Sequence, residues 1–208
     1  MCVENLESAL EIHIEGEVET VDTNGLYTIP GDQVSPLVYL RDSPLTKLNS
    51  ALIEFARAVT ESDQNVLNLA HALMQHTNAA IAYTSGATDV GTTAADALAL
   101  GKGVCQDYTH CLLAIARWHQ IPARYVTGYL LTDADGHSHD ASHAWAELHI
   151  ADLGWVGFDP TNNCCPDARY IRVGSGIDAQ DAALIRGISR GVGQETMQTS
   201  VNIQNAQQ

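Results

Sequence analysis

The stretch Gly101-Lys102-Gly103-Val104-Cys105-Gln106-Asp107-Tyr108 is the part of the sequence that decides the fold. After the cysteine, apolar residues recur at helical spacing, which predicts a helix that begins at or near Cys105. Unpaired backbone N–H groups and the positive end of the helix dipole lie at such a start, so a thiol there is expected to lose its proton more easily. Because the thiolate is the nucleophilic form, Cys105 is a candidate nucleophile. The alternative is a small buried cysteine that happens to open a helix.

The composition limits the classes of partner. The 208 residues suffice for one domain with a real core, and 45% hydrophobic and 17% charged residues are typical of a folded globular protein. The formal net charge of -15 repels nucleic-acid phosphates and anionic lipid, so we expect no nucleic-acid or membrane partner. No apolar run reaches the length of a membrane span, and residues 1–7 lack a signal-peptide pattern.

The cysteines predict a reducing compartment. Their count is odd and their spacing irregular, which argues against a disulfide framework and favours a cytoplasmic location. No CxxC spacing occurs, and two adjacent cysteines are poor ligands for one zinc, so we expect no metal and no cofactor. The five are Cys2, Cys105, Cys111, Cys164 and Cys165.

Apolar and polar residues alternate near the N-terminus. The alternation over 10–21 predicts a strand with an acidic outer face, and 26–29 is expected to return beside it. We therefore divide the chain into a short β-rich lead-in over 1–40, a main domain over 41–204 and a tail over 205–208.

The main domain is expected to place helices before strands. Ser43 and Pro44 are typical of a helix start, Ser62 or Asp63 of a second one, and Thr93 with Asp96 resembles a capping box. The helix from Cys105 should end near residue 120, because Pro122 cannot continue it. Strands are predicted over 123–131, 143–150, 155–159, 170–173 and 195–204, with a polar loop over 132–142.

A cysteine nucleophile needs a base, and the base needs an orienting group. His143 opens one strand of the predicted hairpin, and Asp159 closes the other. Ends of adjacent antiparallel strands can lie side by side, so the aspartate can accept from one imidazole nitrogen while the other faces the sulfur. Cys105, His143 and Asp159 are therefore a candidate catalytic set.

The residues that carry this set resemble the bacterial transglutaminase-like superfamily. The matching motifs are Gly103–Tyr108, Ile121–Tyr129, His143–Trp145 and Gly154–Asn162, with weaker likeness over Tyr170–Val173 and around Arg186 and Arg190. The resemblance covers about residues 40–204. It implies a papain-like α+β fold, in which a helical layer packs on an antiparallel sheet, and a triad of Cys105, His143 and Asp159. It also implies acyl transfer on amides through a thioester.

The sequence departs from the family in two places. The part before residue 40 is shorter than the β-rich region that family members usually carry. Calcium-dependent animal transglutaminases use a tryptophan upstream of the cysteine as an oxyanion donor, but the first tryptophan here is Trp118, so neither that donor nor a calcium requirement is transferred. The backbone N–H of Cys105 is the expected donor, with Tyr83 or Gln106 as a second.

Several other side chains can be interpreted as either structural or functional. Trp145 and Trp155 either line a substrate cleft or pack in the core. Asp107 is expected to cap the helix, His110 lies off the face of Cys105, and Cys111 is expected to be packed. His137, His139 and Asp140 belong to the polar loop, where a solvated surface is the default.

The sequence thus predicts a cysteine-dependent enzyme that acts on a protein or peptide substrate. Water is always abundant, so hydrolysis is favoured over transfer to an amine co-substrate. The alternative is a transglutaminase-like scaffold that binds proteins without catalysis, although a scaffold has no need of all three triad residues.

Overall fold

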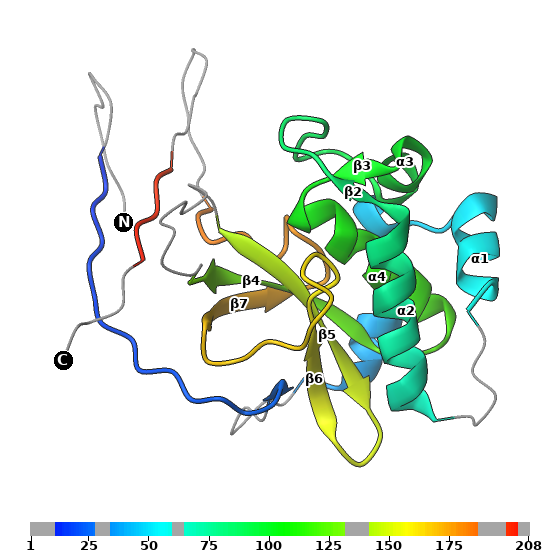
Figure 1. Cartoon of the computed structure of the whole chain (residues 1–208), viewed down its shortest axis with the longest axis horizontal. Coiled ribbons are helices and arrows are strands. Elements are labelled where there is room, and N and C mark those ends of the chain that lie inside the picture. Colours follow the sequence, from blue (N-terminus) through cyan, green and yellow to red (C-terminus); the bar gives the residue numbers. More distant parts are fainter. Residues whose placement is uncertain (1–10, 28–33, 60–64, 132–141, 187–198, 204–208) are drawn as a thin grey trace.

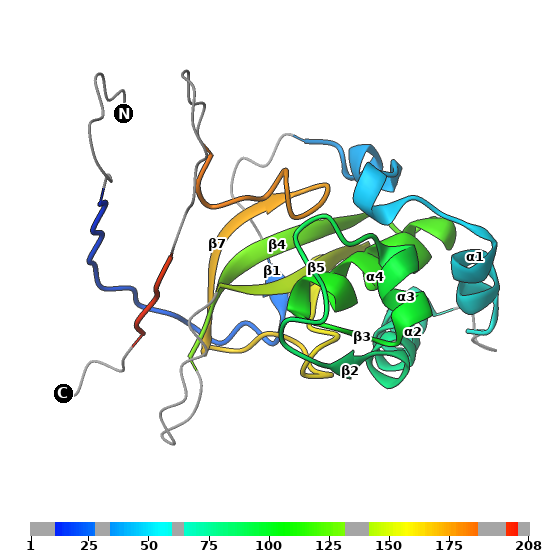
Figure 2. The same ribbon diagram turned by 90° about the horizontal axis from the view of Figure 1, so that it is seen from above.

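The structure is a computed structural model that describes residues 11–27, 34–59, 65–131, 142–186 and 199–203. A five-stranded sheet in the order β1-β6-β5-β4-β7, antiparallel throughout, is covered on one face by four α-helices (Figure 1; Figure 2). This arrangement confirms the predicted α+β class. The strands of the sheet are β1 (Leu26–Tyr27), β4 (Ala123–Leu130), β5 (His143–Ile150), β6 (Gly154–Phe158) and β7 (Tyr170–Gly176). The helices are α1 (Ser50–Arg57), α2 (Val66–Ala80), α3 (Ala94–Leu100) and α4 (Cys105–Trp118).

Helix α4 is the centre of the core. It packs against α1, α2, α3 and strands β4 and β5, and every residue from Asp107 to Arg117 is buried. A helix surrounded on all sides needs few charged residues, which explains the apolar run after Cys105. On β5 the alternate residues Ala144, Ala146 and Leu148 join this core, so the residues between them point to the opposite face of the sheet. The predicted start at Cys105 is confirmed, and the helix ends at Trp118.

The sequence signals for the starts of the helices were partly correct. Ser43 and Pro44 open only a short 3-10 turn, Pro44–Thr46, because the Asn49 side chain accepts from the backbone N–H of Leu52 and starts α1 there. Asn65 caps α2, while the predicted starts at 62 and 63 lie outside the described residues. The Thr93 capping box is confirmed, and Gly101 ends α3 in the left-handed conformation.

The N-terminal strand prediction was wrong. Residues 11–21 form no strand, and their apolar side chains face solvent; Ile14 is 88% exposed. A strand needs a neighbour for its backbone hydrogen bonds, and β1 takes β6 as its partner instead of this segment. Residues 199–203 are also not in a strand. Positions 10, 28, 29, 195–198 and 204 of these predicted strands lie outside the described residues, and the division at residue 40 stays a prediction.

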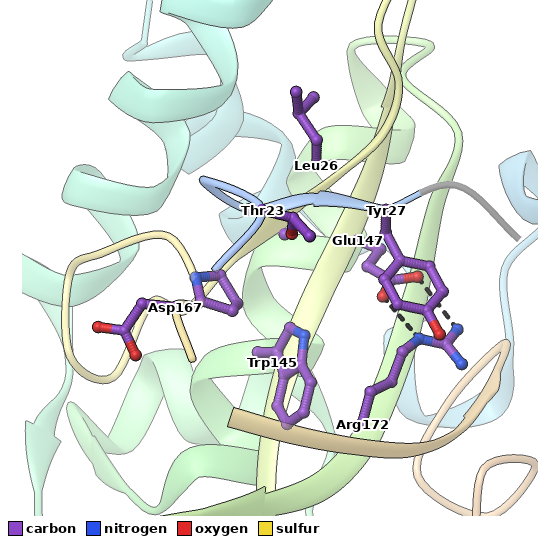
Figure 3. Close-up of a pocket in the computed structure, with 10 residues that line it drawn as sticks. Thr23, Leu26, Tyr27, Trp145, Glu147, Asp167 and Arg172 are labelled. Carbon is purple, nitrogen blue, oxygen red and sulfur yellow. Dashed lines mark hydrogen bonds and ion pairs between the residues drawn. The ribbon is translucent and has the colours of Figure 1, made fainter. Parts of the chain in front are cut away.

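The face of the sheet opposite the helices carries a buried ion cluster. Glu147 on β5 accepts from Arg124 on β4 at 2.6 Å and from Arg172 on β7 at 2.8 Å. The guanidinium of Arg124 lies 4.0 Å from the ring centre of Trp155, and that of Arg172 lies 4.5 Å from the ring centre of Tyr27. Beside this cluster is a cavity of about 50 Å³ (Figure 3). Trp155 therefore packs in the core, away from the start of α4.

Two short strands complete the fold near Cys105. Strand β2 (Ala82–Tyr83) pairs in parallel with β3 (Lys102–Gly103), so the chain just before Cys105 is fixed to the segment after α2. None of the described helices is both long enough and apolar enough to cross a membrane.

The buried imidazole of His110 makes stability depend on pH. The side chain is fully buried in α4, and its Nε2 accepts from the backbone N–H of Ala179 at 3.2 Å. Burial lowers the pKa of His110 to about 4, although the charge of Asp178 opposes this shift. Between pH 6.5 and 4 the unfolded chain binds a proton that the folded chain does not. The free energy of unfolding therefore falls as the pH drops through this window, by at most about 3 kcal/mol.

We predict that His110→Gln removes this part of the pH dependence, because the glutamine oxygen can still accept from Ala179 but does not titrate. Urea unfolding at pH 7 and pH 4.5 measures it, with His13→Gln at an exposed position as the control. An equal loss of stability on acidification in the wild type and in His110→Gln would contradict the assignment.

Candidate active site at the start of α4

The backbone around Cys105 is held by a buried carboxylate. Asp107 accepts from the backbone N–H of Val104 at 2.8 Å and from the hydroxyl of Thr88 at 2.6 Å, which confirms its predicted role as a helix cap. A Cβ at Gly103 would lie 2.6 Å from the Asp107 carboxylate, so only glycine fits there. Gly103 and Asp107 together fix Cys105 as the first residue of α4.

Tyr83 lies near Cys105. It pairs with Gly103 in the β2–β3 register, and the hydroxyl of Tyr108 donates to the carbonyl of Ile81 just before β2. Burial and the negative charge of Cys105 raise the pKa of Tyr83. Half of the Tyr83 surface is exposed.

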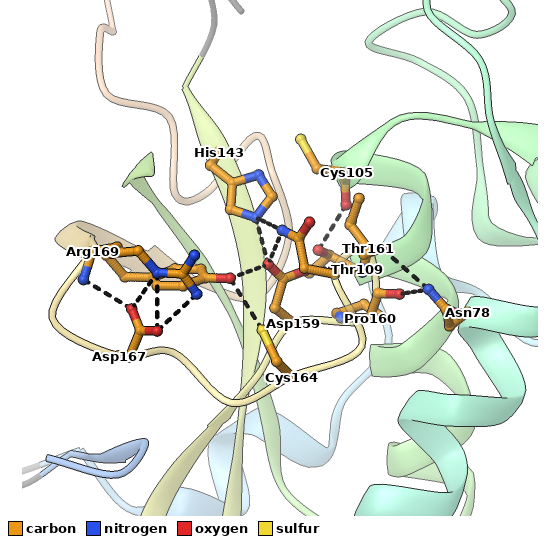
Figure 4. Close-up of polar contacts among 12 residues, drawn as sticks. Asn78, Cys105, Thr109, His143, Asp159, Pro160, Thr161, Cys164, Asp167 and Arg169 are labelled. Atoms are coloured by element: carbon orange, nitrogen blue, oxygen red, sulfur yellow. Dashed lines mark hydrogen bonds and ion pairs between the residues drawn. The ribbon is translucent and has the colours of Figure 1, made fainter. Parts of the chain in front are cut away.

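His143 and Asp159 are brought together by the hairpin of β5 and β6. The register pairs Ala146 with Phe158, which places the start of β5 beside the residue that follows β6. His143 Nε2 lies 2.7 Å from Asp159 Oδ2, and the Asp159 side chain is fully buried (Figure 4). The predicted contact between the imidazole and the carboxylate is therefore present.

Asp159 accepts hydrogen bonds on both oxygens. Oδ1 accepts from the backbone N–H groups of Thr161 and Asn162 at 2.9 and 3.2 Å. Oδ2 accepts from the side-chain amide of Asn162 at 2.7 Å and from the hydroxyl of Tyr170 at 2.8 Å, besides His143. Burial raises the pKa of Asp159, but these donors and the charge of His143 outweigh it and leave the pKa below its usual value.

The other nitrogen of His143 is left for Cys105. Burial lowers the pKa of His143, but the hydrogen bond to Asp159 and the negative charges of Asp159 and Cys105 raise it to about 9. Because Asp159 occupies Nε2, the nitrogen that serves the sulfur is Nδ1. Figure 4 shows the Cys105 side chain beside the imidazole ring. The structure thus places Cys105 near the pair of His143 and Asp159, and the catalytic role of the three side chains stays a prediction.

The indole of Trp145 packs near the imidazole of His143. It is 2% exposed, and its ring centre lies 6.2 Å from that of His143 and 5.4 Å from that of Tyr170. A Cβ at Gly128 would lie 2.7 Å from this indole, so glycine makes room for it. Gln106 follows Cys105 in α4 and is partly exposed. Substrate binding by Trp145, Tyr83 and Gln106 stays a prediction.

Sequence reasoning did not identify the side chains that hold Asp159. Asn162 had a local signal, because an aspartate often accepts from backbone N–H groups two and three residues later in a turn. Tyr170 had none, since it reaches Asp159 from another strand. Cys111 is fully buried, as predicted, and His110 is fully buried as well. His137, His139 and Asp140 lie outside the described residues, within which no group of three potential metal ligands occurs.

We predict that Asp159→Asn lowers the pKa of His143 from about 9, because burial then acts without the hydrogen bond and the charge of the carboxylate, and only Cys105 still opposes it. NMR titration of ring-labelled histidine measures it, and His143→Gln assigns the signal. Asp167→Asn, which removes a carboxylate paired with Arg169 at 2.8 Å, is the matched control. A His143 that still titrates near 9 in Asp159→Asn would show that the carboxylate does not set its charge.

Comparison with known proteins agrees with this geometry. A family model described as the transglutaminase-like superfamily matches residues 53–160. Uncharacterized proteins of Mycobacterium leprae and Mycobacterium tuberculosis are both 39% identical, over 125 and 115 residues; these matches cover 58% and 51% of this chain but only 44% and 37% of those proteins. The chain thus spans less than half the length of these relatives.

A solved structure has the same fold. The crystal structure of a candidate cysteine protease from Cytophaga hutchinsonii is 28% identical, with a TM-score of 0.63 over 79% of this chain and 56% of that one. The family model covers more than half of the residues, including Cys105, His143 and Asp159. The chain therefore belongs to the transglutaminase-like superfamily.

Proposed function

We propose that this protein is a cysteine-dependent acyl-transfer enzyme that acts on amides and hydrolyses them. The observation that carries the proposal is the buried hydrogen bond of 2.7 Å between His143 and Asp159, with the Cys105 side chain beside the imidazole (Figure 4). A hydrogen-bonded nucleophile, base and orienting acid is the arrangement that activates a thiol.

The first half of the reaction forms a thioester. His143 Nδ1 takes the proton of the Cys105 thiol, and the sulfur attacks the carbonyl carbon of the amide. The carbonyl electrons move to the oxygen and then return as the C–N bond breaks, while His143 gives its proton to the departing amine. Asp159 stabilises the imidazolium in both proton transfers, so its own ionised state must persist throughout.

The second half releases the acyl group. His143 takes a proton from water as the water oxygen attacks the thioester carbonyl, the C–S bond then breaks to give a carboxylic acid, and His143 returns the proton to the departing Cys105 thiolate. An amine in place of water would give a new amide instead. Water is favoured because it is always present at high concentration, whereas an amine needs a site that holds it.

Donors to the developing oxyanion lie at the start of α4. As the first helical residue, Cys105 has a backbone N–H with no acceptor within the helix, so it is free to donate to an oxyanion formed at the sulfur. Tyr83 and Gln106 flank this position and are the candidates for a second donor.

The substrate class follows from the family and from the accessible sulfur. The likeness to the candidate cysteine protease supports a protein or peptide substrate. Cys105 is partly exposed at the surface, as attack on a chain segment requires. A reducing compartment, such as the cytoplasm, would keep this thiol free for the reaction.

A single incubation separates the outcomes. We predict that a glutamine-containing protein releases ammonia or new α-amino groups in the presence of the chain, while a fluorescent amine is incorporated more slowly than hydrolysis proceeds. Mass spectrometry of the substrate and fluorescence of the separated protein measure the two routes. Cys105→Ala is the control and should lose both, because each route passes through the thioester.

If the amine were incorporated faster than the substrate is hydrolysed, the proposed activity would be transamidation and not hydrolysis. Product formation at the same rate by Cys105→Ala would contradict the proposed nucleophile. Binding of the substrate protein without any product would favour the non-catalytic scaffold.

A further inference from the structure

Tyr170 connects strand β7 to the candidate active site. It is the first residue of β7, is 7% exposed, and donates from its hydroxyl to Asp159 Oδ2 at 2.8 Å. Its ring lies edge-on to Trp145 with the centres 5.4 Å apart, and 5.9 Å from the centre of the His143 ring. The ring is therefore held by packing, so its hydroxyl has a fixed direction.

The oxygen that Tyr170 contacts is the one that faces the imidazole. Asp159 Oδ2 accepts from His143, from the Asn162 amide and from Tyr170, while Oδ1 is held by backbone N–H groups of the next turn. Rotation of the carboxylate about its bond to Cβ would break contacts on both oxygens at once. The orientation of Oδ2 toward His143 is thus fixed by its donors.

The donors differ in how firmly they are held. Asn162 belongs to the same turn as Asp159 and is exposed, so water competes for its amide and the turn can move with it. Tyr170 comes from a different strand and is buried. Since β7 pairs with β4 and β4 pairs with β5, Tyr170 ties the carboxylate to the same sheet that carries His143.

We propose that Tyr170 is a positioning residue that holds the ionised carboxylate of Asp159 against His143 during acyl transfer. This inference rests on the proposed function. The hydroxyl favours the charged form of Asp159, because a donor stabilises the anion and cannot donate in the same way to a protonated oxygen. Loss of the hydroxyl should therefore let Asp159 take up a proton at a higher pH, and His143 would then lose its anionic partner.

The alternative is that Tyr170 is a buried polar group that needs any available acceptor. The Cys164 sulfur lies 3.4 Å from the same hydroxyl, so the tyrosine has a second contact. In that case the hydroxyl would contribute to stability only. Its removal would then change the reaction rate by the same factor whether or not the Asp159 carboxylate is present.

A double-mutant cycle separates the two interpretations. Tyr170→Phe keeps the ring against Trp145 and removes only the hydroxyl. We expect it to lower kcat/KM for the amide substrate about tenfold, mostly in kcat, and to move the acid limb of the pH profile upward. In an Asp159→Asn background the same change should alter kcat/KM less than about twofold, because there is no ionised carboxylate left to hold. Tyr129→Phe on β4 is the matched control, and thermal unfolding checks that each variant is folded.

A tenfold loss that persists in the Asp159→Asn background would overturn the proposal, as would a loss with no movement of the acid limb. A second measurement does not depend on turnover: NMR titration of the Asp159 carboxyl carbon should give a higher pKa in Tyr170→Phe than in the wild type. An unchanged titration would overturn the positioning role. If the wild type shows no turnover but the Asp159 titration moves, the proposed function fails while the role of Tyr170 toward Asp159 stands.

Discussion

The buried carboxylate of Asp159 is the constraint on which the site depends. A charge without solvent costs several kcal/mol unless donors replace the lost water. Here backbone N–H groups, an amide, a tyrosine hydroxyl and an imidazole supply those donors, and they keep the carboxylate ionised. The ionised carboxylate in turn stabilises the protonated imidazole of His143, which is itself largely shielded from solvent. The protonation of His143 therefore depends on the part of the sheet that holds Asp159 and Tyr170 together.

The fold gives the two halves of the site different supports. Cys105 depends on α4, whose start is fixed by Asp107 and by the close packing at Gly103. His143 and Asp159 depend on the hairpin of β5 and β6. Because α4 packs directly on β5, the two supports share one core and cannot shift independently without disrupting it. The ion cluster around Glu147 lies on the opposite face of the sheet and helps hold β4, β5 and β7 together.

Much of the fold could be predicted from local sequence patterns, and the predictions that failed did so because they concerned contacts between distant parts of the chain. The helix at Cys105, the hairpin from His143 and the α+β class were predictable because period, proline and capping signals are local. Residues 11–21 have an equally clear strand pattern but find no partner, since pairing is a property of the whole fold. The candidate triad was predicted because the order of four motifs along the chain resembles that of a known family. The hydroxyl of Tyr170 was not, because its contact with Asp159 depends on how β7 packs.

Alkylation of the cysteines by iodoacetamide, mapped peptide by peptide, measures whether the Cys105 thiol is activated by His143. Burial raises the pKa of Cys111, and also those of Cys164 and Cys165, so these thiols should react slowly. We expect Cys105 to be modified at least about tenfold faster than these three, with most of that excess lost in His143→Ala. Equal rates at all four cysteines, or an excess at Cys105 that His143→Ala leaves intact, would contradict an imidazole-activated thiol.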